Sequence, residues 1–387
     1  MTHARHGPLA GIRVVEFAGI GPGPMCGMLL ADMGAEVLLI ERPQPSDIGL
    51  ARPRKFDLAH RGKRSLTVDL KRPEGVALSL DLVTCADVLV EGFRPGVMER
   101  LGLGPDVCLV RRPALVYGRV TGFGQTGPLR EAAGHDLNYI ALSGALHAIG
   151  RADQAPTAPL NLLGDYAGGA MSLAWGIACA LVERNRSGRG QVIDAAMVEG
   201  AALLMTPAVG LQAAGLHSGP HGTNLLDGGA PHYDVYRCAD GEYLAFGAIE
   251  RKFRAAFAQR AGLPANSLDE LDDPATWIAA RQRLSTLFAT RTQAEWCALL
   301  EGSDACVTPV LGTSQMARHP HLAARAVVQE HDGIAQPAPA PRLSRTPATI
   351  AGAPPRPGQG GGALAGAWGM DMERLQSLAD ASVVRYE

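Results

Sequence analysis

Two short segments carry side chains that can exchange protons, and each follows a glycine. The first is Gly134-His135-Asp136-Leu137-Asn138-Tyr139, and in the second Asp165 precedes an apolar stretch. A helix that begins at a glycine-led loop leaves backbone amides unpaired, and these favour an oxyanion. His135 and Asp165 facing one small site would form a general acid and base. The spacing equally suits a plainer interpretation, in which Asp136 and Asp165 are helix N-caps and His135 is a loop histidine.

Cationic side chains recur where predicted strands end. Arg42 and Lys71 each follow a strand, and Arg94 and Arg100 flank a turn after the buried strand 87–90. Ligands of open α/β sheets collect at such ends. Because guanidinium groups match phosphate oxygens in pairs, the three arginines are enough to hold a ribose phosphate and a diphosphate. The alternative for each of them is a solvated surface arginine.

The glycine-rich turn 19–24 partly matches a dinucleotide-binding fingerprint. It follows a predicted strand and opens a helix, and Glu41 ends the next strand. Position 24 is proline where a third glycine is expected, and Pro22 and Pro24 remove amides that a pyrophosphate would need. The turn therefore favours a tight strand-to-helix connection over a nicotinamide site.

The spacing of apolar residues predicts an α/β first part and a smaller α+β part. Predicted strands are 12–18, 36–40, 65–70, 87–90 and 114–120, and a hairpin covers 233–245. Predicted helices are 22–33, 73–84, 136–149, 165–183, 196–216, 250–261, 274–289, 294–301 and 371–379. We expect a large α/β domain over 1–200 that is completed by 330–387, a small domain over 225–320, and linkers at 201–224 and 321–329.

Composition limits the classes of partner and of compartment. The 387 residues are 47% hydrophobic with a formal net charge of −2, so no overall field attracts nucleic acid or an anionic membrane. The seven cysteines are scattered and never form CxxC, which argues against a disulfide framework or a zinc site. The apolar stretch near 167–181 is short and glycine-rich for a membrane span. We expect a cytoplasmic enzyme without a metal.

Five ordered motifs resemble the family III coenzyme A transferases, also called CaiB/BaiF proteins. They are Arg42 in a Glu-Arg-Pro context, Arg94-Pro95-Gly96 with Leu101-Gly102-Leu103-Gly104, the segment Thr121 to Pro128, the segment Gly134 to Tyr139, and the segment Leu162 to Gly169. The similarity runs from about residue 8 to about residue 350. A histidine at 135 with an aspartate at 165 resembles the alpha-methylacyl-CoA racemase branch, since transferase members usually carry an aromatic residue there. His232 stands where similar racemases tend to have tyrosine.

The resemblance implies a Rossmann-like large domain made from both chain ends, a small domain, and two subunits interlocked as a homodimer. It implies no cofactor beyond the coenzyme A of the substrate. Glu250 would approach the site from the partner subunit. Coenzyme A would lie against a set of residues that the resemblance transfers: Arg42, Val68, Asp69, Leu70, Lys71, Gly92, Phe93, Arg94, Arg100, Gly134, Asp136, Leu137, Asn138 and Tyr139.

The chemistry expected from this branch is racemisation at the carbon beside a thioester. His135 and Asp165 would serve its two faces, and the pKa of Asp165 must be raised so that it can return a proton. Amides near 134–136 would hold the enolate oxygen. The rival prediction is a transferase in which Asp165 attacks an acyl-CoA and His135 is not needed. A non-catalytic CoA-binding protein and a nicotinamide oxidoreductase are further alternatives.

Overall fold

The computed structural model describes residues 6–44, 49–264 and 266–387, so the first residues of the predicted large domain lie outside the described part. The chain forms two compact units. The first holds Met1–Ser143, Leu160–Leu204 and His321–Glu387, and the second holds Gly144–Pro159 and Met205–Pro320. The first unit thus contains both chain ends. Residues 144–159, which the sequence analysis assigns to the large domain, belong to the second unit.

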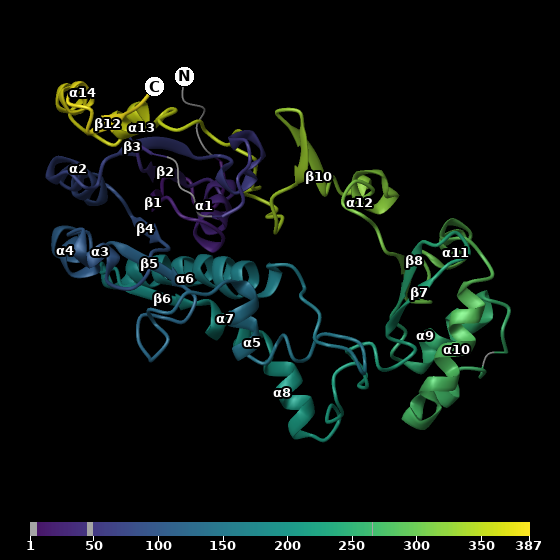
Figure 1. Ribbon diagram of the computed structural model, residues 1–387. Helices are drawn as coiled ribbons and strands as arrows, with labels where there is room; N and C mark the ends of the chain where they lie inside the picture. The colour runs from purple at the N-terminus through teal and green to yellow at the C-terminus, as the bar shows by residue number, and fades with distance from the viewer. Residues whose placement is uncertain (1–5, 45–48, 265) are drawn as a thin grey trace. The chain divides into compact units, whose positions relative to one another are not determined.

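A seven-stranded sheet forms the centre of the first unit, in the order β12-β3-β2-β1-β4-β5-β6 (Figure 1). Its parallel strands are β1 (Arg13–Phe17), β2 (Glu36–Glu41), β3 (Arg64–Val68), β4 (Val88–Glu91), β5 (Val116–Thr121) and β6 (Val192–Ala196). The short β12 (Val384–Arg385) pairs with β3 antiparallel. The parallel order 3-2-1-4-5-6 is that of doubly wound α/β folds. The predicted α/β class with a large parallel sheet is confirmed.

Helices cover both faces of this sheet because neighbouring strand residues point to opposite sides. Val15 and Leu89 enter one core, and Val14 and Val88 enter the other. The helices of the first face are α2 (Pro73–Thr84), α3 (Val97–Arg100), α4 (Pro105–Arg111), α13 (Gly361–Ala367) and α14 (Met372–Asp380). Those of the second face are α1 (Pro22–Asp32), α5 (Asp136–Leu142), η3 (Leu162–Met171), α6 (Ser172–Ser187) and α7 (Met197–Leu204). The predicted βαβ units at the start of the chain are confirmed.

The π-helix η3 continues directly into α6 as one helical run, Leu162–Ser187. The run has 26 residues, longer than the apolar stretch expected from the sequence, and by length and composition alone it could cross a membrane. A core helix passes the same test, and α6 places Leu173, Ile177 and Leu181 in the second core. Part of this run is therefore buried inside the first unit.

The second unit is built on a three-stranded antiparallel sheet with helices beside it. Its strands are β7 (Asp234–Arg237), β8 (Tyr243–Phe246) and β9 (Val307–Pro309). Its longer helices are α8 (Thr206–Ala213), α9 (Arg251–Arg260), α10 (Trp277–Phe288) and α11 (Gln293–Leu300). Phe246, Phe257, Phe288 and Trp296 form an aromatic centre in its core. The predicted hairpin over 233–245 is confirmed as β7 and β8.

Some predicted elements differ from the structure for local reasons. The helix predicted over 136–149 ends at Leu142, because Gly144 turns the chain with a φ of 84°. The helix predicted over 196–216 is two helices, and the break precedes Pro207, which has no amide to continue a ladder. Two short helices, η1 (Arg54–Phe56) and η2 (Leu58–His60), precede α2. The short elements that follow residue 315 are η6 (Met316–Arg318), α12 (Pro320–Ala324), β10 (Val328–His331) and β11 (Ile334–Pro337).

Candidate active site

The predicted site residues of the first unit gather at the carboxyl edge of the sheet. β1 and β4 are neighbours, and the chain order reverses between them, which is where open α/β sheets bind ligands. The turn Gly19–Pro24 follows β1, Arg42 follows β2, and Gly92–Arg94 follow β4. Parallel strands end on the same side, so these segments lie at one edge of the sheet (Figure 1).

Helix α5 is fixed to this edge by Tyr139. Its ring meets Phe123 edge-on at 5.1 Å, and its hydroxyl donates a hydrogen bond to the Gly134 carbonyl. The ring lies directly on Gly122, just after β5, where an added Cβ would come within 2.2 Å of it. Burial raises the pKa of Tyr139 to about 12, and the charge of Asp165 adds to this. Tyr139 is therefore a buried wedge that sets the position of the α5 N-terminus.

His135 is the N-cap residue of α5, and its side chain is exposed. Its backbone amide donates to Asn138 Oδ1 at 3.1 Å, and the Asn138 amide donates to the His135 carbonyl at 2.8 Å. This reciprocal pair closes the first turn of α5. The alternative that Asp136 is the N-cap of its own helix is wrong, because His135 holds that position.

The Asp136 carboxylate instead begins the next helix. Oδ1 accepts the amides of Gly164 at 2.6 Å and of Asp165 at 2.7 Å, and the residue is only 4% exposed. An added Cβ at Gly164 would meet this oxygen at 2.8 Å, so only glycine permits the approach. One carboxylate thereby joins the segment of His135 to the segment of Asp165.

Asp165 lies inside the first turn of η3, so it is not a helix N-cap. Its Oδ2 accepts a hydrogen bond from Asn161 Nδ2 at 3.1 Å and sits beside Gly21 in the turn after β1. Burial raises the pKa of Asp165; the Asn161 hydrogen bond and the charge of His135 oppose the rise, and Asp136 adds to it. The raised pKa expected from the sequence is confirmed. Asn161 was missed by sequence reasoning, although its position four residues before Asp165 on a helix was a usable signal.

The π-helix that carries Asp165 is held by close backbone contacts. An added Cβ at Gly200 of α7 would lie 1.9 Å from the Gly168 carbonyl oxygen, and one at Gly168 would lie 2.7 Å from the Ala201 amide nitrogen. π-helices are rare in proteins. Here the glycines let η3 and α7 touch through their backbones, and this close packing holds the helix that carries Asp165.

The residues predicted to contact coenzyme A fall into three groups. Those with exposed side chains are Arg42, Lys71, Arg94, Arg100, Leu137 and Asn138, and exposed Gly92 has no side chain. Asp69, Leu70, Phe93 and Gly134 are half-buried. Val68 is fully buried in the first core and pairs with Val384, and the Asp136 and Tyr139 side chains face inward. A ligand can reach these three only through their backbone.

Glu41, the acidic residue that a dinucleotide fingerprint requires, is already bonded to two side chains of the protein. The Glu41 carboxylate accepts Arg54 Nη2 at 3.1 Å and the Ser65 hydroxyl at 2.5 Å. Deeper under the same turn, Lys63 Nζ donates to Glu16 at 2.7 Å and to the Pro24 carbonyl at 2.9 Å, with both charged side chains fully buried. Lys63 thus ties the turn after β1 to the core. Within the described residues, no group of three or more His, Cys, Asp or Glu side chains is arranged to hold a metal.

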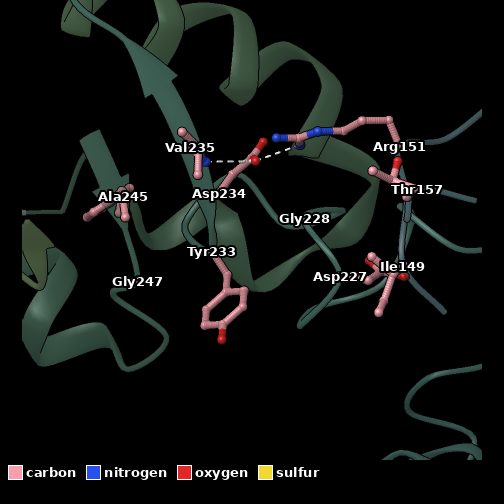
Figure 2. A pocket seen from close by; sticks show the side chains of 12 residues that line it. Ile149, Arg151, Thr157, Asp227, Gly228, Tyr233, Asp234, Val235, Ala245 and Gly247 are labelled. Carbon is pink, nitrogen blue, oxygen red and sulfur yellow. Dashed lines mark hydrogen bonds and ion pairs between the residues drawn. The ribbon is translucent and has the colours of Figure 1, made fainter. Parts of the chain in front are cut away.

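The remaining predicted residues lie in the second unit. Glu250 is an exposed residue just before α9. His232 is 3% exposed with its ring edge-on to Trp277 at 6.2 Å, and burial lowers its pKa to about 4. This unit also contains a cavity of about 510 Å³. Its wall includes Tyr233 and the ion pair of Arg151 with Asp234 (Figure 2). No predicted site residue lines this cavity.

Known proteins of similar sequence and fold place this chain in a family. The chain matches the CoA-transferase family III over residues 9–360. An alpha-methylacyl-CoA racemase of Mus musculus is 49% identical over 341 residues, which is 88% of this chain and 87% of that protein. The racemase of Homo sapiens is 46% identical over 343 residues, with the same two shares. The crystal structure of a CaiB/BaiF family protein from Brucella suis has a TM-score of 0.80 at 25% identity and covers 94% of this chain and 100% of its own. The chain belongs to the CoA-transferase family III.

Proposed function

We propose that this chain is an alpha-methylacyl-CoA racemase, which interconverts the (2R) and (2S) forms of 2-methylacyl-CoA thioesters. One observation carries the proposal: the buried carboxylate of Asp136, the residue after His135, accepts the backbone amides of Gly164 and Asp165 and so joins the segments that carry His135 and Asp165. The identity of 49% and 46% to two racemases over 88% of the chain supports it. The substrate is thus an acyl-CoA, and the coenzyme A moiety is its only cofactor-like part.

Racemisation requires an acid and a base on opposite faces of the alpha carbon. Neutral His135 removes the proton from one enantiomer, and protonated Asp165 returns a proton to the other face; for the opposite enantiomer the two exchange roles. The raised pKa of Asp165, caused mainly by burial, favours the protonated acid that the second step needs.

Between the two proton transfers the thioester oxygen carries negative charge. The first amides of a helix have no partner within that helix, and those of Asp136 and Leu137 begin α5 beside His135. We propose that they hold the enolate oxygen, with each well-placed donor worth about 3 kcal/mol. Glu250 is proposed to reach the site from a partner subunit and to orient the His135 ring.

Coenzyme A is proposed to lie along the same edge, with Arg42, Lys71, Arg94 and Arg100 as its phosphate contacts. All four side chains are exposed at or near the carboxyl ends of β2, β3 and β4. Arginine forks match phosphate oxygens in pairs, so a local cluster suffices in a chain whose net charge is −2. The first unit, which holds these strands, is accordingly proposed as the CoA-binding domain.

We also propose that two copies associate as an interlocked homodimer. Large apolar side chains of the first unit are exposed along α5, α6 and α7: Leu142, Trp175, Val182 and Leu203 are 61%, 73%, 56% and 70% exposed. Contiguous exposed apolar surface is typical of an interface. Light scattering should give twice the chain mass, and Trp175→Glu should shift it toward the monomer mass; an unshifted mass counts against this face. Seven free cysteines suit a reducing compartment, and we propose the cytoplasm.

The test is NMR in deuterated water on one enantiomer of a 2-methylacyl-CoA. Wild type should exchange the alpha proton and produce the other enantiomer, and His135→Ala and Asp165→Asn should each abolish this. His321→Ala, an exposed histidine of α12, is the matched control and should behave as wild type. Transfer of CoA to an added carboxylate, surviving in His135→Ala and without alpha exchange, would instead identify a transferase that uses Asp165 as nucleophile.

A further inference from the structure

Asp136 stands between the two groups that move protons, yet its own side chain is turned away from solvent. It is the residue after His135, it is 4% exposed, and its Oδ1 accepts the amide of Asp165 itself at 2.7 Å as well as that of Gly164 at 2.6 Å. A carboxylate that receives two backbone amides makes charge-assisted bonds, which are shorter and stronger than neutral ones. The contact is therefore a rigid link between α5 and η3.

Three other features show that the link is built for this contact. The first is the absence of a side chain at Gly164, where a Cβ would lie 2.8 Å from Oδ1. The second is that Oδ2 of Asp136 is buried with no hydrogen-bond partner among the described residues, so the carboxylate is held through Oδ1 alone. The third is that Tyr139 and Asn161 brace the link from each side, one through the Gly134 carbonyl and one through Asp165 Oδ2.

We propose that Asp136 is a positioning residue for the racemisation, which sets the separation between His135 and Asp165 and supplies a fixed negative charge beside Asp165. The inference rests on the proposed racemase function and deepens it. Its carboxylate is buried and accepts two backbone amides, so it acts through the two segments that it joins. A displacement of about 1 Å in a reacting group can cost about 100-fold in rate, which is the effect expected when the link is lost.

The fixed charge has a second consequence, on pH. The groups that act on the Asp165 carboxyl are Asp136, His135 and Tyr139 from α5, together with the Asn161 hydrogen bond. Asp136 raises the pKa of Asp165, because a second negative charge nearby disfavours ionisation. Removing that charge while keeping the acceptor oxygen should move the pH limit that Asp165 sets to lower pH. A purely structural role would leave those limits unchanged.

Three variants separate geometry from charge. Asp136→Asn keeps an acceptor oxygen and removes the charge, Asp136→Ala removes both, and Gly164→Ala keeps both but displaces the carboxylate. We expect Asp136→Ala and Gly164→Ala to lower kcat about 100-fold with KM within about threefold of wild type. Asp136→Asn should lower kcat less and shift the pH profile. Asp371→Ala is the matched control, because Asp371 also accepts two amides, at the start of α14, and its loss should leave kcat unchanged.

The measurement is alpha-proton exchange and racemisation across pH for each variant, with thermal unfolding as a check on folding. If wild type racemises and folded Asp136→Ala and Gly164→Ala keep kcat within threefold of it, the positioning role is refuted while the proposed function stands. An unmoved pH profile in Asp136→Asn refutes the role of the charge. Absence of racemisation in wild type refutes the proposed function itself, independently of Asp136.

Discussion

Replacing Gly122 by alanine should be costly although it adds one methyl group. The backbone at Gly122 is not left-handed, so alanine is allowed there and the effect comes from space alone. The new Cβ would lie 2.2 Å from Tyr139 Cε1 and 2.5 Å from Cζ. To reach an ordinary contact near 3.4 Å, the ring must retreat by roughly 1.2 Å, and it is only 6% exposed.

The retreat has a cost that can be worked out from its contacts. Overpacking a core typically costs about 1 to 3 kcal/mol. The shift also strains the bond from the Tyr139 hydroxyl to Gly134, worth about 1 kcal/mol, and the edge-on contact with Phe123, worth about 1 kcal/mol. We expect a loss of about 2 to 4 kcal/mol in the free energy of unfolding. Because Tyr139 sets the start of α5, racemisation should also fall, by about 100-fold.

A double-mutant cycle with Tyr139→Ala tests this reasoning. Tyr139→Ala alone should cost about 3 to 5 kcal/mol through its cavity, and it leaves room for the methyl group of the Gly122→Ala variant. In that background the extra cost of Gly122→Ala should vanish, a coupling of more than 1 kcal/mol by urea unfolding. Equal costs of Gly122→Ala in the two backgrounds, or a single-variant cost under about 0.5 kcal/mol, would refute the close packing of Tyr139 on Gly122.

Three further predictions address charge. Asp165→Asn should lower racemisation by about 100-fold or more. Since burial raises the pKa of Asp165, the variant should also unfold at a higher urea concentration than wild type at neutral pH. This gain in stability should disappear as the pH falls to 3.8, the ordinary pKa of an aspartate. Arg42→Ala with Arg94→Ala should weaken CoA binding by calorimetry about 10- to 100-fold with an unchanged melting temperature; equal affinity excludes the phosphate role. Lys63→Met should cost about 3 to 5 kcal/mol by leaving Glu16 unpaired, and adding Glu16→Gln should recover part of it; a cost below 1 kcal/mol contradicts the buried pair.

The active-site pair illustrates how far residue types alone carry the argument. A histidine and an aspartate, each after a glycine at a predicted helix start, made His135 and Asp165 candidates, and the family resemblance favoured them over helix caps. The same pattern allowed Asp136 to be the cap of its own helix, which the structure contradicts. Its true partners are amides 28 and 29 residues away. No local pattern encodes a bond of that range, because it depends on how two helices pack.

The elements of the fold also differ in how far local sequence predicts them. Local periodicity determined β1, α1, β2, α2 and the strands after them to within a few residues, since buried strands and helices need apolar side chains at fixed spacing. It could not find β12, whose two residues form a strand only because the edge of β3 offers unpaired backbone groups. It also missed α13, a glycine- and alanine-rich helix that is stabilised by packing on β3.

By itself, the sequence determined the class of the fold and predicted His135, Asp165 and the arginines at strand ends as site residues, because these predictions use local spacing, residue chemistry and the family resemblance. The tertiary structure alone decided which side chains meet. It placed Asp165 beside Gly21, turned Asp136 inward and set Tyr139 on Gly122. These contacts join segments that are distant along the chain, and their geometry is fixed by the order of strands in the sheet and by close packing of its helices.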